Sequence, residues 1–223
     1  MKPYYEQDGV TIYHGDCREV LPSVSLPDAA IIADPPYGIS YPGKGVDGNA
    51  PGNDHGPITG DGVAFDPGHM LALDLPTILW GGIYFADALP RTGGWLVWDK
   101  LRPESAWHAQ AEIAWTNCVN TCRVFRYLWH GMIRQGERNT SHHPTQKPLE
   151  LMAWCIRFVE ASLIVDPYIG AGATLVAAKN TGRRAIGIEI EERYCEIAAK
   201  RLSQTVMSFE NETPASGDRG NAG

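Results

Sequence analysis

The sequence predicts an α/β fold, in which a mostly parallel sheet carries helices on both faces. Short apolar runs alternate along the chain with segments of helical periodicity, which is the pattern of such folds. Two of these runs, 31–33 and 163–165, are continuous and are each followed by Asp-Pro, as expected for strands buried on both faces. We predict one domain over residues 1–209 and a disordered polar tail over residues 210–223.

The individual elements follow from apolar periodicity and from the residues that stop it. Expected strands cover residues 10–13, 29–33, 77–80, 95–98, 112–116, 123–129, 163–166 and 185–190. Expected helices cover residues 18–21, 67–73, 84–89, 106–111, 149–161, 172–181 and 193–202. Pro148 favours a helix start, and Gly182 favours a helix end. Residues 38–62 are rich in Gly and Pro, so we expect a mobile loop that acts as a lid, with plain disorder as the alternative.

The composition excludes several classes of protein. The formal net charge of −7 provides no overall basic field, so a polyanionic partner must be met by a local basic patch. The five cysteines are odd in number and scattered, which indicates a reducing compartment rather than a disulfide framework. The first residues lack the apolar core of a signal peptide, and no apolar run reaches the ~20 residues that span a bilayer. We expect a soluble cytoplasmic protein with no membrane partner.

The first chemical motif is Asp34-Pro35-Pro36-Tyr37, directly after the expected strand 29–33. The prolines stop the strand and hold Asp34 at its carboxyl end, where open α/β sheets bind their ligands. A carboxylate, a free proline carbonyl and an aromatic ring can together hold a planar group that carries an amino substituent. The alternative is a simple strand-ending turn.

The second motif runs from Asp166 to Thr174 and leads from a strand through a glycine turn into a helix. Gly170 and Gly172 permit close approach of a ligand to backbone N–H groups at the helix N-terminus. Glu189 ends the next strand, where an acidic side chain typically binds ribose hydroxyls. Leu175 replaces the third glycine of a dinucleotide fingerprint, and no P-loop lysine is present. We therefore expect a nucleoside ligand with little or no phosphate, a structural glycine turn being the alternative.

The third motif is His143-Pro144-Thr145-Gln146-Lys147-Pro148, just before the expected helix 149–161. Thr145 and Lys147 could meet a carboxylate on the ligand, although proline-rich punctuation before a helix would look similar. Together with Gly187-Ile188-Glu189 through Tyr194, the three motifs resemble those of the DNA amino-methyltransferases, in the permuted order of the β group. The resemblance covers the chain from about residue 10 to residue 203.

The resemblance implies a Rossmann-like methyltransferase fold with a mostly parallel seven-stranded sheet and a circularly permuted motif order. It implies methyl transfer from S-adenosylmethionine, without a metal, to an exocyclic nitrogen of a base flipped out of double-stranded DNA. The catalytic residues would be Asp34, Pro35, Pro36 and Tyr37. The cofactor-binding residues would be Asp16, Asp34, Thr145, Lys147, Asp166, Tyr168, Gly170, Gly172, Thr174 and Glu189.

The resemblance also assigns roles within the cofactor site. Asp16 would contact the adenine and Glu189 the ribose of the cofactor. Asp166 and the glycine turn would approach its methionine part, with Thr145 and Lys147 near the carboxylate. The chain departs from the usual family pattern of Phe and Gly-Thr-Thr at Tyr168 and at 173–175, where Ala-Thr-Leu stands. The alanine removes one hydroxyl contact, so we expect weaker cofactor binding at most.

The target base and the DNA contacts are the next expectations. Aspartate at the position of Asp34 is commoner in adenine-N6 enzymes of this family, whereas serine is commoner there in cytosine-N4 enzymes. Adenine N6 is therefore the favoured target. Residues 118–147 form a basic and aromatic segment, which we expect to recognise DNA; a solvated hairpin is the alternative. Its expected DNA-binding residues are Arg123, Arg126, Arg134 and Arg138. The segment is short, which indicates a brief target sequence or help from a second subunit in a homodimer.

Several other functions fit the sequence less well. A methyltransferase acting on RNA bases or protein amides normally carries its cofactor motif first. A catalytically silent DNA-binding module would not need an intact Asp34 and Tyr37. Leu175 argues against a nicotinamide cofactor. Cys118 and Cys122 lack a second tight pair of zinc ligands, so buried thiols are favoured there, and we expect none of the cysteines to be essential.

Overall fold

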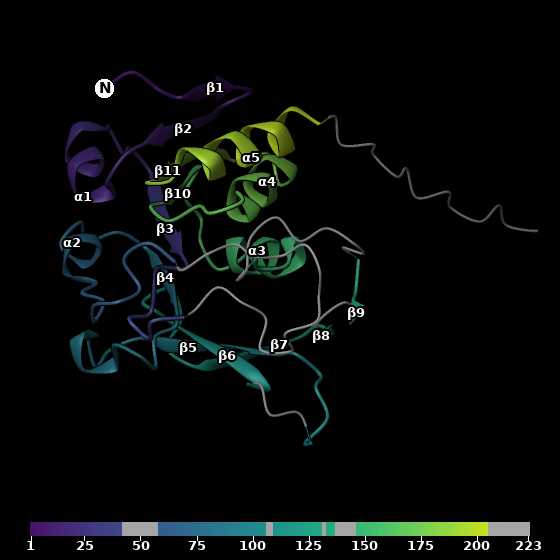
Figure 1. Cartoon of the computed structure of the whole chain (residues 1–223). Coiled ribbons are helices and arrows are strands. Elements are labelled where there is room, and N and C mark those ends of the chain that lie inside the picture. The colour runs from purple at the N-terminus through teal and green to yellow at the C-terminus, as the bar shows by residue number, and fades with distance from the viewer. Residues whose placement is uncertain (42–57, 106–108, 131–132, 137–145, 205–223) are drawn as a thin grey trace, which may run out of the picture.

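The fold is built on a twisted sheet that lies between two layers of helices (Figure 1). The computed structural model describes residues 1–41, 58–105, 109–130, 133–136 and 146–204. Within these residues nine strands form the sheet, in the spatial order β1 (Tyr5–Gln7), β2 (Val10–His14), β11 (Arg184–Glu189), β10 (Leu163–Asp166), β3 (Ala29–Ala33), β4 (Thr77–Trp80), β6 (Ala111–Thr116), β5 (Gly94–Asp99) and β7 (Cys122–Arg126). Two further strands, β8 (Trp129–His130) and β9 (Ile133–Arg134), pair with each other.

The helices are short, and they occupy both faces of the sheet. They are α1 (Cys17–Val20), α2 (Gly68–Leu71), α3 (Leu149–Ile156), α4 (Ala173–Asn180) and α5 (Glu192–Ser203), with 3-10 turns η1 (Leu21–Ser23) and η2 (Ala86–Ala88). Ile31 of β3 packs in one core cluster with residues of α1 and α2, whereas its neighbour Ile32 packs in the other with residues of α3, α4 and α5. The continuous apolar run of β3 is therefore explained by burial on both sides.

The strand directions decide which residues meet at the functional edge. Neighbouring strands run parallel from β2 through β11, β10 and β3 to β4, and β5 is parallel to β7. Strand β6 is antiparallel to both β4 and β5. The carboxyl ends of β3, β4, β5, β10 and β11 consequently lie at one edge of the sheet, together with the amino end of β6.

The expected fold class is confirmed, while several boundaries differ from expectation. The seven-stranded core runs from β2 to β5, and β1 and β7 add one strand at each edge. A helix over 106–111 is wrong at its end, because Ala111 already pairs in β6; residues 106–108 lie outside the described residues. The strand expected over 123–129 ends at Arg126, because its neighbour β5 ends opposite, at Asp99.

Three further segments were only partly foreseen. The helix expected to reach residue 161 ends at Ile156, and the tighter bonds Phe158 N to Cys155 O (3.0 Å) and Val159 N to Ile156 O (3.3 Å) follow it. The expected helix 84–89 is reduced to the turn η2. Most of the expected lid (residues 42–57) and the whole of the expected tail, 210–223, lie outside the described residues. Where the chain is described, no helix is both long and apolar enough to cross a bilayer.

Candidate active site

A cavity of about 690 Å³ lies at the carboxyl edge of the central strands. Its walls include Asp34 after β3, Asp166 at the end of β10 and Glu189 at the end of β11. Glu112, from the amino end of β6, and Tyr84 complete the side next to Asp34. This is the position where open α/β sheets bind ligands, since loops diverge from the carboxyl ends of parallel strands.

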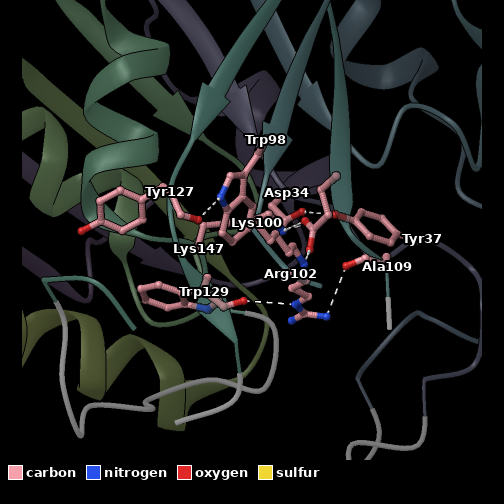
Figure 2. A network of polar contacts seen from close by, with 10 residues as sticks. Asp34, Tyr37, Trp98, Lys100, Arg102, Ala109, Tyr127, Trp129 and Lys147 are labelled. Carbon is pink, nitrogen blue, oxygen red and sulfur yellow. Dashed lines mark hydrogen bonds and ion pairs between the residues drawn. The ribbon is translucent and has the colours of Figure 1, made fainter. Parts of the chain in front are cut away.

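The Asp34-Pro35-Pro36-Tyr37 turn brings a carboxylate, a phenol and an ammonium group together (Figure 2). The Tyr37 hydroxyl donates to Asp34 Oδ1 at 2.6 Å, and Lys147 Nζ donates to Asp34 Oδ2 at 2.5 Å. Lys147 also donates to the Tyr37 hydroxyl at 3.2 Å. Burial raises the pKa of Asp34, although the Lys147 charge opposes this, and 19% of the side chain stays exposed toward the cavity.

A single carboxylate fixes the backbone that follows the Asp34-Pro35-Pro36-Tyr37 turn. Asp61 Oδ1 accepts from Gly38 N at 2.8 Å and from Ile39 N at 3.4 Å, and Asp61 Oδ2 accepts from Tyr41 N at 2.6 Å. Asp61 is itself buried, with 3% exposure. Nothing in the sequence motifs pointed to this residue, because its partners are backbone groups some 20 positions away.

The ring of Tyr37 is placed by two neighbours that follow β4. Gly81 has φ +77°, and a Cβ there would lie 2.0 Å from Tyr37 Cε1, so the ring occupies space that any other residue would fill. Tyr84 stacks on Tyr37 with ring centroids 4.9 Å apart and an interplanar angle of 17°. The ring of Tyr37 was expected to help hold a planar group, and here it already stacks on another aromatic ring.

Two charged residues that the motifs did not indicate complete the surroundings of Asp34. Glu112 accepts a hydrogen bond from Lys100 Nζ, and its other oxygen lies 3.1 Å from Lys147 Nζ. Burial alone would raise the pKa of Glu112, but the charges of Lys147 and Lys100 lower it to about 2. Lys147 was expected near the cofactor's carboxylate, but here its Nζ donates to Asp34 and Tyr37 and lies 3.1 Å from the carboxylate of Glu112.

The carboxylates that end β10 and β11 are held by backbone amides. Asp166 Oδ1 accepts from Tyr168 N at 2.9 Å, and burial raises the pKa of Asp166 to about 7. Glu189 accepts from Gly170 N and from Glu191 N, both at 2.9 Å, and burial raises its pKa as well. The second motif therefore folds onto Glu189, which joins two stretches that were recognised separately.

Asp16 follows β2, next to the end of β11, and is the N-cap of α1. Its carboxylate accepts from Arg18 N at 2.9 Å and pairs with the Arg18 guanidinium at 2.5 Å. The side-chain hydrogen bond with Arg18 lowers the pKa of Asp16, which keeps it ionised.

The remaining expected residues are distributed as follows. The cavity walls contain Asp16, Asp34, Pro35, Pro36, Tyr37, Lys147, Asp166, Tyr168, Gly170, Thr174 and Glu189. Gly172 is not among them; it caps α4 with φ +79°, and a Cβ there would lie 2.8 Å from Ala198 Cβ. Thr145 and Arg138 lie outside the described residues. Within those residues, no three His, Cys, Asp or Glu side chains are grouped to hold a metal ion.

Two of the expected DNA-binding arginines, Arg123 and Arg126, have described side chains, and neither lines the cavity. Arg123 and Arg126 are exposed on β7, the outermost strand of the sheet, and Arg134 belongs to β9. Arg126 Nε is 3.6 Å from Asp99 Oδ2, and both side chains are open to solvent. Because β7 is parallel to β5, Arg126 is at the same edge as Asp34.

The fold is Rossmann-like, and comparisons with known proteins show which proteins the chain is similar to. Residues 96–200 match a family described as DNA methylase. The Type II methyltransferase M2.LlaDCHI of Lactococcus lactis subsp. cremoris is 27% identical, over 91% of this chain and 93% of that protein. These matches support the resemblance to the DNA amino-methyltransferases that the motifs predicted.

Two solved structures share the fold. The M1.HpyAVI–SAM complex has a TM-score of 0.54 and 22% identity, covering 86% of this chain and 100% of the other. The PvuII DNA methyltransferase (cytosine-N4-specific) has a TM-score of 0.61 and 16% identity, covering 93% and 91%. The second motif and Asp34 are thus carried by a fold that solved methyltransferases also use.

Proposed function

We propose that the protein is a site-specific DNA methyltransferase that transfers a methyl group from S-adenosylmethionine to N6 of an adenine flipped out of the duplex. The observation that carries the proposal is the position of Asp34, which shares one cavity with Asp166 and Glu189. A carboxylate for the amino group of a base and carboxylates for a nucleoside cofactor therefore face the same space.

The residues of the cavity fit S-adenosylmethionine. A volume of about 690 Å³ lies within the usual range for small-molecule sites. Asp16, Asp166 and Glu189 supply acceptors for amino and hydroxyl groups and negative charge toward a cation. A carboxylate has about four lone-pair sites, so Glu189 keeps acceptor capacity beyond its two backbone bonds. When bound, the cofactor supplies a methyl group that is already activated by its sulfonium.

The task left to the protein is alignment and electrostatics. The amino nitrogen of adenine is a poor nucleophile, because its lone pair is delocalised into the ring. Asp34 and the Pro35 carbonyl accept its two N–H groups, which draws the nitrogen toward sp³ geometry. As the new N–C bond forms, the nitrogen becomes more acidic, and its surplus proton passes to Asp34. The base reaches this position only after leaving the duplex, so base flipping is part of the proposal.

The alternative target is N4 of cytosine. The PvuII enzyme, which shares the fold, is cytosine-N4-specific, and the amino groups of both bases offer two N–H groups to Asp34. Asp34 favours adenine because that residue is commoner in adenine-N6 enzymes. On the DNA side, we assign residues 118–147 as the recognition segment and a second copy of the chain as a candidate partner on the duplex.

The test uses labelled S-adenosylmethionine and unmodified duplex DNA, followed by digestion to nucleosides. Label in N6-methyl-2′-deoxyadenosine supports the proposal, and label in N4-methyl-2′-deoxycytidine selects the alternative. Asp34→Ala should lower the transfer rate by about 10²–10³-fold, the usual effect of removing an oriented polar group from a reacting centre. Asp87→Ala, at an exposed aspartate of η2, should leave the rate unchanged. Unlabelled DNA in every case, with the protein folded, would contradict the proposal.

A further inference from the structure

The antiparallel direction of β6 gives the catalytic carboxylate an unexpected set of neighbours. Glu112 lies at the amino end of β6, opposite Trp98 of β5, and so reaches the edge where β3 and β5 end. Lys100 follows β5 directly, and Asp34 follows β3 directly. Residues far apart in the sequence thus form one row of ion pairs at this edge, of which Figure 2 labels Lys100, Lys147 and Asp34.

The row is a continuous chain of ion pairs with alternating sign. Lys100 Nζ pairs with one oxygen of Glu112, and Lys147 Nζ lies 3.1 Å from the other oxygen. Lys147 then pairs with Asp34 at 2.5 Å. The lysine side chains are only 9% and 6% exposed, so both ammonium groups are largely withdrawn from water.

The chain is electrically balanced, which explains how so many charges can be buried. Lys100 and Lys147 carry two positive charges, and Glu112 and Asp34 carry two negative charges. The ammonium of Lys100 also lies 4.7 Å from the centroid of the Trp98 ring, which adds a cation–π contact. Removal of one member would leave an opposite charge buried without compensation, which is far costlier than loss of an exposed pair.

We propose that Glu112 is a positioning residue for methyl transfer: braced by Lys100, it shares Lys147 with Asp34 and thereby sets the charge of that carboxylate. The role rests on the proposed function, because it concerns the carboxylate that accepts the amino group of the base. Lys147 is the residue that pairs with Asp34. Glu112 pairs with Lys147, and Lys100 pairs with Glu112, so both act on Asp34 through Lys147.

Lys147 and Glu112 change the pKa of Asp34 in opposite directions. Asp34 is faced by Tyr37 from its own turn, by Lys147 from the segment before α3, by Glu112 from β6 and, at longer range, by Asp166 from β10. Lys147 favours the ionised carboxylate, whereas Glu112 disfavours it. Glu112 is itself faced by Lys100, Lys147 and, more distantly, Arg102. Neutralising Glu112 should therefore lower the pKa of Asp34, and neutralising Lys147 should raise it.

The experiment measures the carboxyl pKa of Asp34 by ¹³C NMR on protein labelled at aspartate, with Asp34→Asn to assign the signal. We expect the pKa to move down by about one pH unit in Glu112→Gln and up by a similar amount in Lys147→Met. Glu112→Asp keeps the negative charge, so the pKa of Asp34 should stay near its wild-type value in that variant. If Lys147→Met fails to fold, Glu112→Asp still provides a comparison for Glu112→Gln. Glu160→Gln, at an exposed glutamate, is the matched control.

The rate profile then connects this chain to catalysis. The acidic limb of kcat for DNA methylation should follow the NMR values, moving to lower pH in Glu112→Gln and to higher pH in Lys147→Met. Unmoved pKa values in both variants, or shifts in the same direction, would overturn the positioning role. Shifted pKa values in a protein that methylates no DNA would instead refute the proposed function and leave the ion-pair chain in place.

Discussion

At the scale of single residues, Asp166 is a buried carboxylate whose ionisation opposes folding. Burial raises its pKa to about 7 from the ordinary 3.8. Between those values the folded state holds the proton more tightly than the unfolded state. The stabilisation is therefore complete below pH 3.8 and is lost as the pH rises through about 7.

The pH dependence that follows from this raised pKa can be tested by comparison with Asp166→Asn, whose side chain cannot ionise. From pH 4 to pH 8 the free energy of unfolding of the wild type should fall relative to that of the variant, by roughly 2–4 kcal/mol. Urea denaturation at several pH values measures the difference, in which the other titrating groups cancel. An Asp166→Asn variant that tracks the wild type across this range would show that Asp166 does not hold its proton.

At the scale of elements, the orientation of one strand marks the limit of what the sequence could indicate. Asp34, Asp166 and Glu189 were found from the sequence because each ends an apolar run, and the ends of parallel strands share an edge. Glu112 begins its strand, and in a parallel sheet it would lie at the opposite edge. Only the antiparallel insertion of β6 between β4 and β5 brings it to Asp34, and apolar periodicity carries no strand direction.

The glycine turn illustrates a second limit, because a motif does not say which neighbour requires it. Gly172 was expected to admit a ligand, yet a Cβ there would meet Ala198 of α5 at 2.8 Å. Gly172→Ala should lower the free energy of unfolding by about 2–4 kcal/mol, through left-handed backbone strain together with overpacking between α4 and α5.

Gly182 is the matched control for that substitution. It has φ +71°, close to the +79° of Gly172, but a Cβ would meet nothing within 4 Å. Gly182→Ala should therefore cost only the backbone strain, about 1 kcal/mol. Urea unfolding of both variants isolates the helix contact as the difference, and equal losses would show that backbone conformation alone explains the glycine.

At the scale of the whole molecule, an acidic protein must approach a polyanion. The formal charge is −7, so the field of the molecule repels DNA at long range, and attraction has to come from a restricted part of the surface. The exposed arginines of β7 lie on the outermost strand, and Arg126 lies at the edge that carries the cavity. Its ion pair with Asp99 is exposed and long at 3.6 Å, which leaves the guanidinium available to a phosphate at little cost.

Arg126→Ala should accordingly weaken DNA binding by a similar factor for all sequences and lower the slope of log K against log salt by about 1. Arg91 is an equally exposed arginine, but it precedes the amino end of β5 and so lies at the opposite edge of the sheet. Arg91→Ala should leave the slope unchanged. Fluorescence anisotropy with a labelled duplex at four or more salt concentrations compares the two. Equal effects would mean that net charge alone governs binding, whereas a loss confined to Arg126→Ala fixes the DNA along the edge that holds Asp34.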